Sequence, residues 1–410
     1  MGAHYLELAG YATAAIDDLA VVGANEWTFG ANGDYDSAIL RTADDRMLIA
    51  RCPNSAAAAG EQAAISRSLA SLTPGLRSRL PFTIPTELGR LDGADGQLAV
   101  YEFIPGTTCD RVRLEHDSML VADIGRAVAA IHSLPRQYVE SAGLPVQSAN
   151  DSRDAVEQLM AKARDTGRLP AALDDRWGGA VDDVSLWSFV PSVIHGSLER
   201  GSFLTNGAGV VGVLGWGDLR IGDPARDMSW LHALDGAVTR AVFDEYVESR
   251  GATVDRQLRQ RSTLYAELEL ARWLVHGVET GNDAIIADAE QLLDSLVNRV
   301  RALEQTELRH ETLPVLDLVE VQELLADAGS KNRHPEQRLL RPEDAEHPSG
   351  ELQPGEDFEG ADGYEAEELD EESTFESDDE LHAEVNAEQE AGSRSDHDLG
   401  IDPALRPPRA

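Results

Sequence analysis

A histidine and two serines lie close together in the stretch VIHGSLERGS, residues 193–202, and such residues can do nucleophilic chemistry. A serine hydroxyl becomes a nucleophile when a histidine within hydrogen-bond reach takes its proton. Ser197 follows His195 by only two residues, which is a poor arrangement for a general base in a turn between strand and loop. The glycine that a nucleophile elbow needs two residues after the serine is also missing, because Glu199 stands there. The sequence therefore disfavours a serine hydrolase.

The elements around this segment divide the chain into a β-rich part and a helical part. Residues 20–104 contain strand-like apolar runs around the turn signals GANGD and TADDR, together with one helix over residues 55–72. Residues 115–305 show apolar positions at helical spacing over most of their length. A short cluster of strands over residues 193–216 lies between these helices and contains the polar stretch. A small β-rich lobe followed by a larger helical lobe is the expected organisation.

At residues 193–231 the sequence resembles the aminoglycoside and macrolide phosphotransferases, the antibiotic-kinase branch of the protein-kinase-like fold. The pattern of that family is apolar-His-Gly-Asp-Leu followed by an Asn, then an apolar-Asp-aromatic segment, then Gly-Asp-Pro-x-x-Asp. His195 and Gly196 match the first element, and Gly215 occupies the acid slot of the second. The sequence GDPARD, which ends at Asp227, matches the third element in full. The order and spacing of the three elements make the resemblance fairly specific.

The resemblance covers roughly residues 20–300 and implies a two-lobed protein-kinase-like fold of the α+β class. The chain is then expected to have four parts: residues 1–105, a β-rich lobe of the nucleotide-binding type; residues 106–305, a helical lobe with a degenerate catalytic loop; residues 306–342, a helical and basic connector; and residues 343–410, a disordered acidic tail.

In the first lobe the resemblance implies a nucleotide site. Gly30 and Gly33 could form the loop that covers the phosphates, although a plain hairpin turn explains them equally well. Arg51 stands where kinases place the lysine that holds the phosphates, and Glu61 follows on the next helix, where the partner acid belongs. The first lysine of the chain is Lys162, so Arg51 is the only candidate for this role. An ordinary ion pair between strand and helix is the alternative interpretation.

The resemblance implies ATP and magnesium as cofactors, but the residues that would use them are replaced. The slot of the catalytic aspartate holds Ser197, the slot of the metal-binding asparagine holds Ser202, and the slot of the metal-binding aspartate holds Gly215. Serine cannot act as a base near neutral pH. Magnesium requires oxygen ligands, preferably anionic ones, and glycine has no side chain to supply one. The three changes together indicate lost catalysis.

The expected function is therefore that of a pseudokinase, which binds a ligand or partner without phosphoryl transfer. In it, His195 and Asp227 would hold the loop, and Asp223 would shape the turn into the next helix. The alternative is a residual ATP-dependent phosphotransferase that acts on a hydroxyl of an aminoglycoside, a macrolide or a sugar-like metabolite. Such an enzyme would have to use shifted acids, for which Glu199, Asp218 and Asp223 are the candidates.

The amino-acid composition of the chain limits the kinds of partner that it can bind. The chain has 410 residues and a formal net charge of -39, which argues against binding to nucleic acid or to an anionic membrane. Residues 343–402 carry 24 acidic residues against the single basic Arg394, too polar a composition to form a core. Cys52 and Cys109 have no disulfide or metal-ligand pattern. We expect a cytoplasmic bacterial protein with a small-molecule or protein partner, and the sequence does not predict its oligomeric state.

Overall fold

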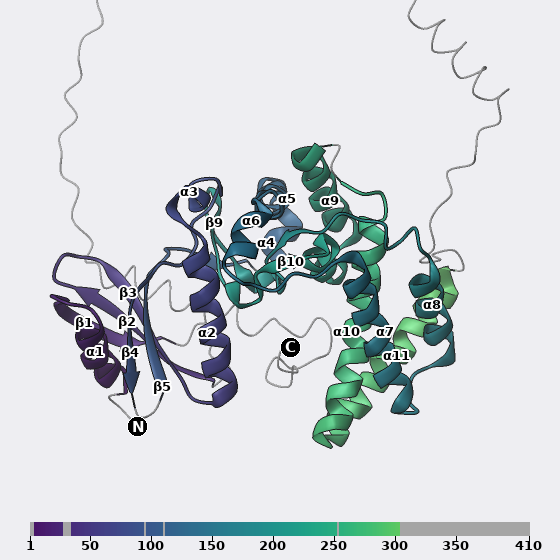
Figure 1. Cartoon of the computed structure of the whole chain (residues 1–410), viewed down its shortest axis with the longest axis horizontal. Coiled ribbons are helices and arrows are strands. Elements are labelled where there is room, and N and C mark those ends of the chain that lie inside the picture. The colour runs from purple at the N-terminus through teal and green to yellow at the C-terminus, as the bar shows by residue number, and fades with distance from the viewer. Residues whose placement is uncertain (1–3, 28–33, 94–95, 110, 252–253, 304–410) are drawn as a thin grey trace, which may run out of the picture. The chain divides into compact units, whose positions relative to one another are not determined.

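The computed structural model describes residues 4–27, 34–93, 96–109, 111–251 and 254–303. Its first part is an antiparallel sheet with the strand order β1-β2-β3-β5-β4 (Figure 1). The strands are β1 (Val21–Glu26), β2 (Tyr35–Thr42), β3 (Met47–Pro53), β4 (Glu87–Gly93) and β5 (Gly96–Glu102). The register pairs Arg51 of β3 with Ser37 of β2 on one side and with Ala99 of β5 on the other. Arg51 therefore lies on the central strand of this sheet.

One face of the sheet is covered by helix α1 (His4–Ala15), which was not predicted from the sequence. Because successive side chains of a strand point to opposite faces, Leu48 and Ala50 of β3 lie on the same face. They are buried with Leu8 and Ala12 of α1 in one apolar core. The sheet thus buries its first face without any contribution from the polar residues of β3.

The opposite face carries helix α2 (Ala56–Ser71), which was expected from its alanine-rich sequence. The helix begins after Ser55, whose side chain accepts a hydrogen bond from the Ala58 backbone N–H at 3.1 Å and so caps the first turn. Leu69 of α2 packs in the same core as Tyr101 of β5. Tyr101 pairs in register with Ile49, which lies two residues before Arg51, so Arg51 also points to the α2 side.

The second part of the structure is mainly helical. A short helix, α3 (Pro74–Arg77), lies earlier in the chain, between α2 and β4. The helices of the second part are α4 (Arg111–His116), α5 (Ser118–His132), α6 (Arg136–Ser141), α7 (Ala149–Asp165), α8 (Ala171–Asp182), α9 (Gly236–Arg250), α10 (Leu258–Thr280) and α11 (Asp283–Leu303). Two apolar cores hold them together. One joins α5 and α9 to the motif segment, and the other joins α7, α8, α10 and α11.

The motif segment forms the small strands and tight turns between these helices. They are β6 (Thr107–Thr108), β7 (Ser192–Ile194), η1 (Arg200–Ser202), β8 (Phe203–Asn206), β9 (Gly209–Val213), η2 (Trp216–Asp218), β10 (Arg220–Gly222) and η3 (Pro224–Ala233). β6, β8 and β9 form one sheet, and β10 pairs with β7 in a second. Helix α2 packs on η2, so the sheet part and the motif segment meet there.

The expected α+β class is confirmed by the antiparallel sheet in the first part and the helices in the second. The predictions for residues 306–342 and 343–410 fall outside the described residues. Across the helices that the structure describes, none combines the length and the apolar character needed to cross a membrane.

Candidate functional site

The turn that follows β7 requires a glycine. Gly196 has a φ of +88°, a left-handed conformation that residues with a side chain rarely adopt. A Cβ atom at this position would lie only 2.3 Å from the backbone oxygen of Asp218. Because Gly196 has no side chain, the turn packs directly on the segment that contains Asp218.

Asp227 of η3 fixes this turn through its backbone. The carboxylate accepts hydrogen bonds from the backbone N–H groups of His195 and Gly196, each at 2.7 Å, and lies 3.1 Å from Nε2 of His132. Burial raises the pKa of Asp227, but the hydrogen bond from His132 and the surrounding donors outweigh it, so the pKa lies below its ordinary value. The carboxylate is therefore ionised, and its contacts do not depend on which side chains the loop carries.

His132 of α5 extends this network to α9, a contact that was not predicted from the sequence. Its Nδ1 lies 2.8 Å from the hydroxyl of Tyr246, and both side chains are buried. A neutral ring satisfies both neighbours when Nε2–H donates to Asp227 and Nδ1 accepts from the Tyr246 hydroxyl. The one available signal was a single polar residue at the end of the apolar helical run AVAAIH.

The His195 ring is buried and faces the segment before η2. Its Nε2 lies 2.9 Å from the Leu214 carbonyl oxygen, so Nε2–H donates there, and its ring centroid lies 4.9 Å from that of Trp216. A ring nitrogen that donates to a carbonyl cannot accept the proton of a serine hydroxyl. This contact argues against Nε2 of His195 as a base for Ser197.

The three slots lie in adjoining turns, and all three carry neutral groups. The Ser197 hydroxyl lies 3.4 Å from the Gly215 carbonyl oxygen. The Ser202 hydroxyl accepts a hydrogen bond from the Glu199 backbone N–H at 3.2 Å, so it supports the turn η1. Gly215 has a φ of +84°, and a Cβ atom there would meet only Cε1 of His195, at 3.6 Å. A side chain at Gly215 would therefore be opposed by backbone strain but not by crowding.

Two of the shifted acids are engaged by arginines. Arg220 donates to the Asp218 carboxylate and, at 2.9 Å, to the Asp218 carbonyl oxygen. Arg261 forms a two-pronged pair with Asp223, with Nε–Oδ2 and Nη2–Oδ1 distances of 2.7 and 3.0 Å. The hydroxyl of Tyr265 also donates to Asp223, at 3.1 Å. Both carboxylates are thus used in holding the segment around η2 and η3.

Arg261 links this segment to the chain before α10. Its side chain is fully buried, and its Nη1 donates to Oδ1 of Asp255 at 2.8 Å and to the Leu186 carbonyl oxygen at 3.0 Å. Burial lowers the pKa of Arg261, but the carboxylates of Asp223 and Asp255 outweigh burial and hold the pKa above its ordinary value. Asp223 is accordingly one member of a buried charge network.

In the first part of the structure, Arg51 packs on an aromatic ring. Its guanidinium carbon lies 4.0 Å from the ring centroid of Tyr35, a cation–π arrangement. The Tyr35 hydroxyl donates to the Ala58 carbonyl oxygen at 2.8 Å, and burial, then the charge of Glu61, raises the pKa of Tyr35. Among the residues that the structure describes, no carboxylate forms an ion pair with Arg51. Tyr35 stands near both Arg51 and Glu61, and the expected direct pair between them is not formed.

The residues around these slots do not fit the magnesium that the resemblance implies. Magnesium is bound through carboxylates and other oxygen ligands in near-octahedral geometry. Over residues 4–303, leaving out the undescribed gaps, no group of three or more His, Cys, Asp or Glu side chains is placed to hold a metal ion. Gly30 and Gly33, the predicted phosphate loop, lie outside the described residues.

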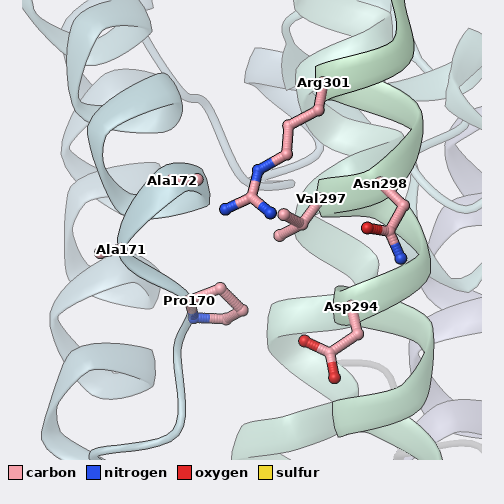
Figure 2. A pocket seen from close by; sticks show the side chains of 7 residues that line it. All are labelled: Pro170, Ala171, Ala172, Asp294, Val297, Asn298 and Arg301. Carbon is pink, nitrogen blue, oxygen red and sulfur yellow. The ribbon is translucent and has the colours of Figure 1, made fainter.

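A hollow of about 420 Å³ lies elsewhere, between the start of α8 and the last turns of α11 (Figure 2). The Arg301 side chain extends from α11 toward α8 in this view. The lining residues are Pro170, Ala171, Ala172, Asp294, Val297, Asn298 and Arg301. None of the predicted site residues is among them, so we place the candidate site at the motif turns and not in this hollow.

Comparison with known proteins gives the same family as the sequence motif of residues 193–231. The model of the Phosphotransferase enzyme family matches residues 29–261, which is more than half of the chain. A relative, the uncharacterized protein YcbJ of Bacillus subtilis (strain 168), is 23% identical over 177 residues. That match covers 40% of this chain and 58% of the relative, so the chain matches less than two thirds of the relative's length.

Solved structures of antibiotic phosphotransferases share the fold. The apoenzyme of macrolide 2'-phosphotransferase MphH from Brachybacterium faecium is 21% identical, with a TM-score of 0.58 over 70% of this chain and 97% of that one. The GDP and kanamycin complex of APH(2")-IIia is 19% identical, with a TM-score of 0.59 over 73% and 99% of the two chains. The expected two-lobed kinase-like fold is confirmed by these structures. With a family match across both of its parts, this chain belongs to the phosphotransferase enzyme family.

Proposed function

We propose that this chain is a catalytically degenerate member of its family that binds a small molecule or a protein partner without transferring a phosphoryl group. The observation that carries the proposal is the chemistry of the three slots, Ser197, Ser202 and Gly215. They lie in the turns where the family motif places its acids and its asparagine, and they hold two hydroxyls and a hydrogen atom.

The general base and the metal ligands that the three slots lack would supply most of the rate enhancement of a phosphotransferase. General base catalysis contributes about 10²–10⁴-fold. Metal neutralisation of the phosphates contributes several kcal/mol more, and each ~1.4 kcal/mol is tenfold in rate. Family enzymes start from roughly 1–100 s⁻¹, as kinases do, so the loss of both terms leaves a negligible turnover.

The alternative of a residual phosphotransferase has less support from the geometry. Asp218 is paired with Arg220, and Asp223 is paired with Arg261 and bonded to Tyr265. A carboxylate that already accepts charged hydrogen bonds is a weaker base and a poorer metal ligand. Either acid would have to break its pair before it could take part in phosphoryl transfer.

A nucleotide is the first ligand to test. The similar solved structures include GDP and ADP complexes of aminoglycoside phosphotransferases, at 19% and 13% identity. The part of the motif that is kept, the backbone of the His195–Gly196 turn held by Asp227, maintains the shape of the site and needs no acid at the slots.

The test measures binding and turnover on the same preparation of the full chain. Transfer from ATP and from GTP is followed with magnesium, with water, kanamycin and a macrolide as acceptors. We expect no transfer above the protein-free rate, and a rise in melting temperature with at least one ligand or partner. Magnesium-dependent transfer that is abolished in Asp218→Asn or Glu199→Gln would refute the proposal and support the shifted-acid enzyme.

A further inference from the structure

We propose that the site binds the phosphate groups of a nucleotide directly to Arg51 and without a divalent cation. The inference rests on the proposed function and adds a property that the family resemblance does not imply, since the resemblance implies magnesium. It follows from the fact that Ser197, Ser202 and Gly215 do not supply the anionic oxygen ligands that magnesium needs.

The three slots present no charge to a ligand. In a site with acids at the slots, the carboxylates and the phosphates repel each other at short range unless a cation stands between them. Here Ser197, Ser202 and Gly215 bring no charge. Of the acids nearby, Asp218 is paired with Arg220, and Asp227 accepts three hydrogen bonds from the loop and from a histidine. The repulsion that magnesium would have to relieve at the three slots is therefore largely absent.

Arg51 supplies a positive charge from the protein itself. Arg51 is half-buried on the α2 side of the sheet, and its guanidinium forms no ion pair within the described residues. An arginine remains charged at any pH at which the protein is folded, and its planar fork can bind two phosphate oxygens at once. Stacking on Tyr35 restricts the side chain without using its charge.

Helix α2 packs both on β3, which carries Arg51, and on η2, which follows Gly215. At η2, a Cβ atom at Gly217 would lie 3.9 Å from Cγ of Glu61. Glu61 in turn acts electrostatically on Tyr35, the ring that carries Arg51. A single helix thus connects the guanidinium to the turn that begins at Gly215.

The first experiment is calorimetric titration of the full chain with ADP and with ATP, once in magnesium and once in EDTA. We expect affinities in the two buffers that agree within about threefold. Arg51→Met should weaken binding in EDTA by about 10- to 100-fold, because charged hydrogen bonds to the phosphates are lost. Arg41→Met is the matched control: Arg41 is an exposed arginine on the neighbouring strand β2, and its loss should leave the affinity unchanged.

The second experiment reintroduces the missing acid. Gly215→Asp and Gly215→Asn bear the same left-handed backbone strain and nearly the same volume, so they differ only in charge. We expect Gly215→Asp to bind nucleotide at least about tenfold more weakly than Gly215→Asn in EDTA, by charge repulsion. Magnesium should restore the affinity of the aspartate variant and leave the asparagine variant unchanged. Melting curves of both variants establish that each is folded.

Three results overturn the inference: nucleotide binding by the wild type only in magnesium, an Arg51→Met variant that binds as well as the wild type, and no nucleotide binding in either buffer. Each of them leaves the proposed function intact, provided that transfer is absent and another ligand or partner raises the melting temperature. Transfer of phosphate by the wild type would instead remove the proposed function, whichever buffer supports binding.

Discussion

Gly196 and Gly215 offer a matched pair of substitutions that tests the geometry of the motif turns. Both residues have left-handed backbones, with φ values of +88° and +84°. They differ in the space around them. A Cβ atom at Gly196 would lie 2.3 Å from the Asp218 carbonyl oxygen, whereas at Gly215 the nearest atom would be Cε1 of His195, at 3.6 Å. Replacing each with alanine therefore adds the same strain but very different crowding.

The magnitudes follow from these two terms. A non-glycine residue in the left-handed region costs about 1–2 kcal/mol, and this cost applies to both variants. Forcing an atom into a filled site costs about 1–3 kcal/mol more, because the neighbouring backbone has to move. We expect Gly215→Ala to lower the free energy of unfolding by about 1–2 kcal/mol and Gly196→Ala by roughly 2–5 kcal/mol.

Urea unfolding followed by tryptophan fluorescence measures this difference. Trp216 directly follows Gly215, is fully buried and lies next to the His195 ring, so its fluorescence contributes to the unfolding signal. Replacing glycine with alanine also makes the unfolded chain less flexible, which stabilises the folded state. This effect is the same in both variants, so it cancels when their free energies of unfolding are compared. Equal losses in the two variants, or a larger loss in Gly215→Ala, would show that the turn does not pack on Asp218 as described.

Two further substitutions test the buried charges. Arg261→Met should lower the free energy of unfolding by about 3–5 kcal/mol, since it leaves Asp223 and Asp255 without their partner; Arg259→Met, an exposed arginine, should cost under about 1 kcal/mol in the same urea titration. Asp227→Asn should cost about 2–4 kcal/mol at pH 7 through lost charged hydrogen bonds. Because the folded state lowers the pKa of Asp227, its contribution is complete above about pH 4 and is lost as the pH falls further. The asparagine variant should therefore lose less stability than the wild type between pH 5 and pH 2, and parallel acid curves would contradict the assignment.

The motif turns were predicted because His195, Gly196 and Asp227 match the resembled family's pattern in order and spacing, and their roles were implied by that resemblance. The pattern does not include His132, which precedes Asp227 by 95 residues in the chain. Such a contact depends on how two helices pack, and a single apolar helix pattern carries no information about its distant neighbour.

Other features could not be predicted because competing contacts decide them. Arg51 and Glu61 have the right spacing for an ion pair, but the ring of Tyr35 contacts the guanidinium in its place. Helix α1 was missed because its residues HYLELAGYATAA are mostly apolar on all sides and show no clear helical stripe. It becomes a helix by covering the sheet face formed by residues such as Leu48, which is a tertiary effect.

The turns also show that the bonds holding the loop do not depend on acids at the three slots. The bonds that hold the His195–Gly196 turn run from backbone N–H groups to Asp227, and these donors are the same whatever side chain stands at Ser197. At Gly215 a glycine relieves the strain that any other residue would cause in the left-handed backbone. An acid at Gly215 would therefore bear this strain and lower the stability of the turn. Gly215→Asp and Gly215→Asn should each weaken the fold by the strain at this one residue, so that the difference in their nucleotide binding can be attributed to charge.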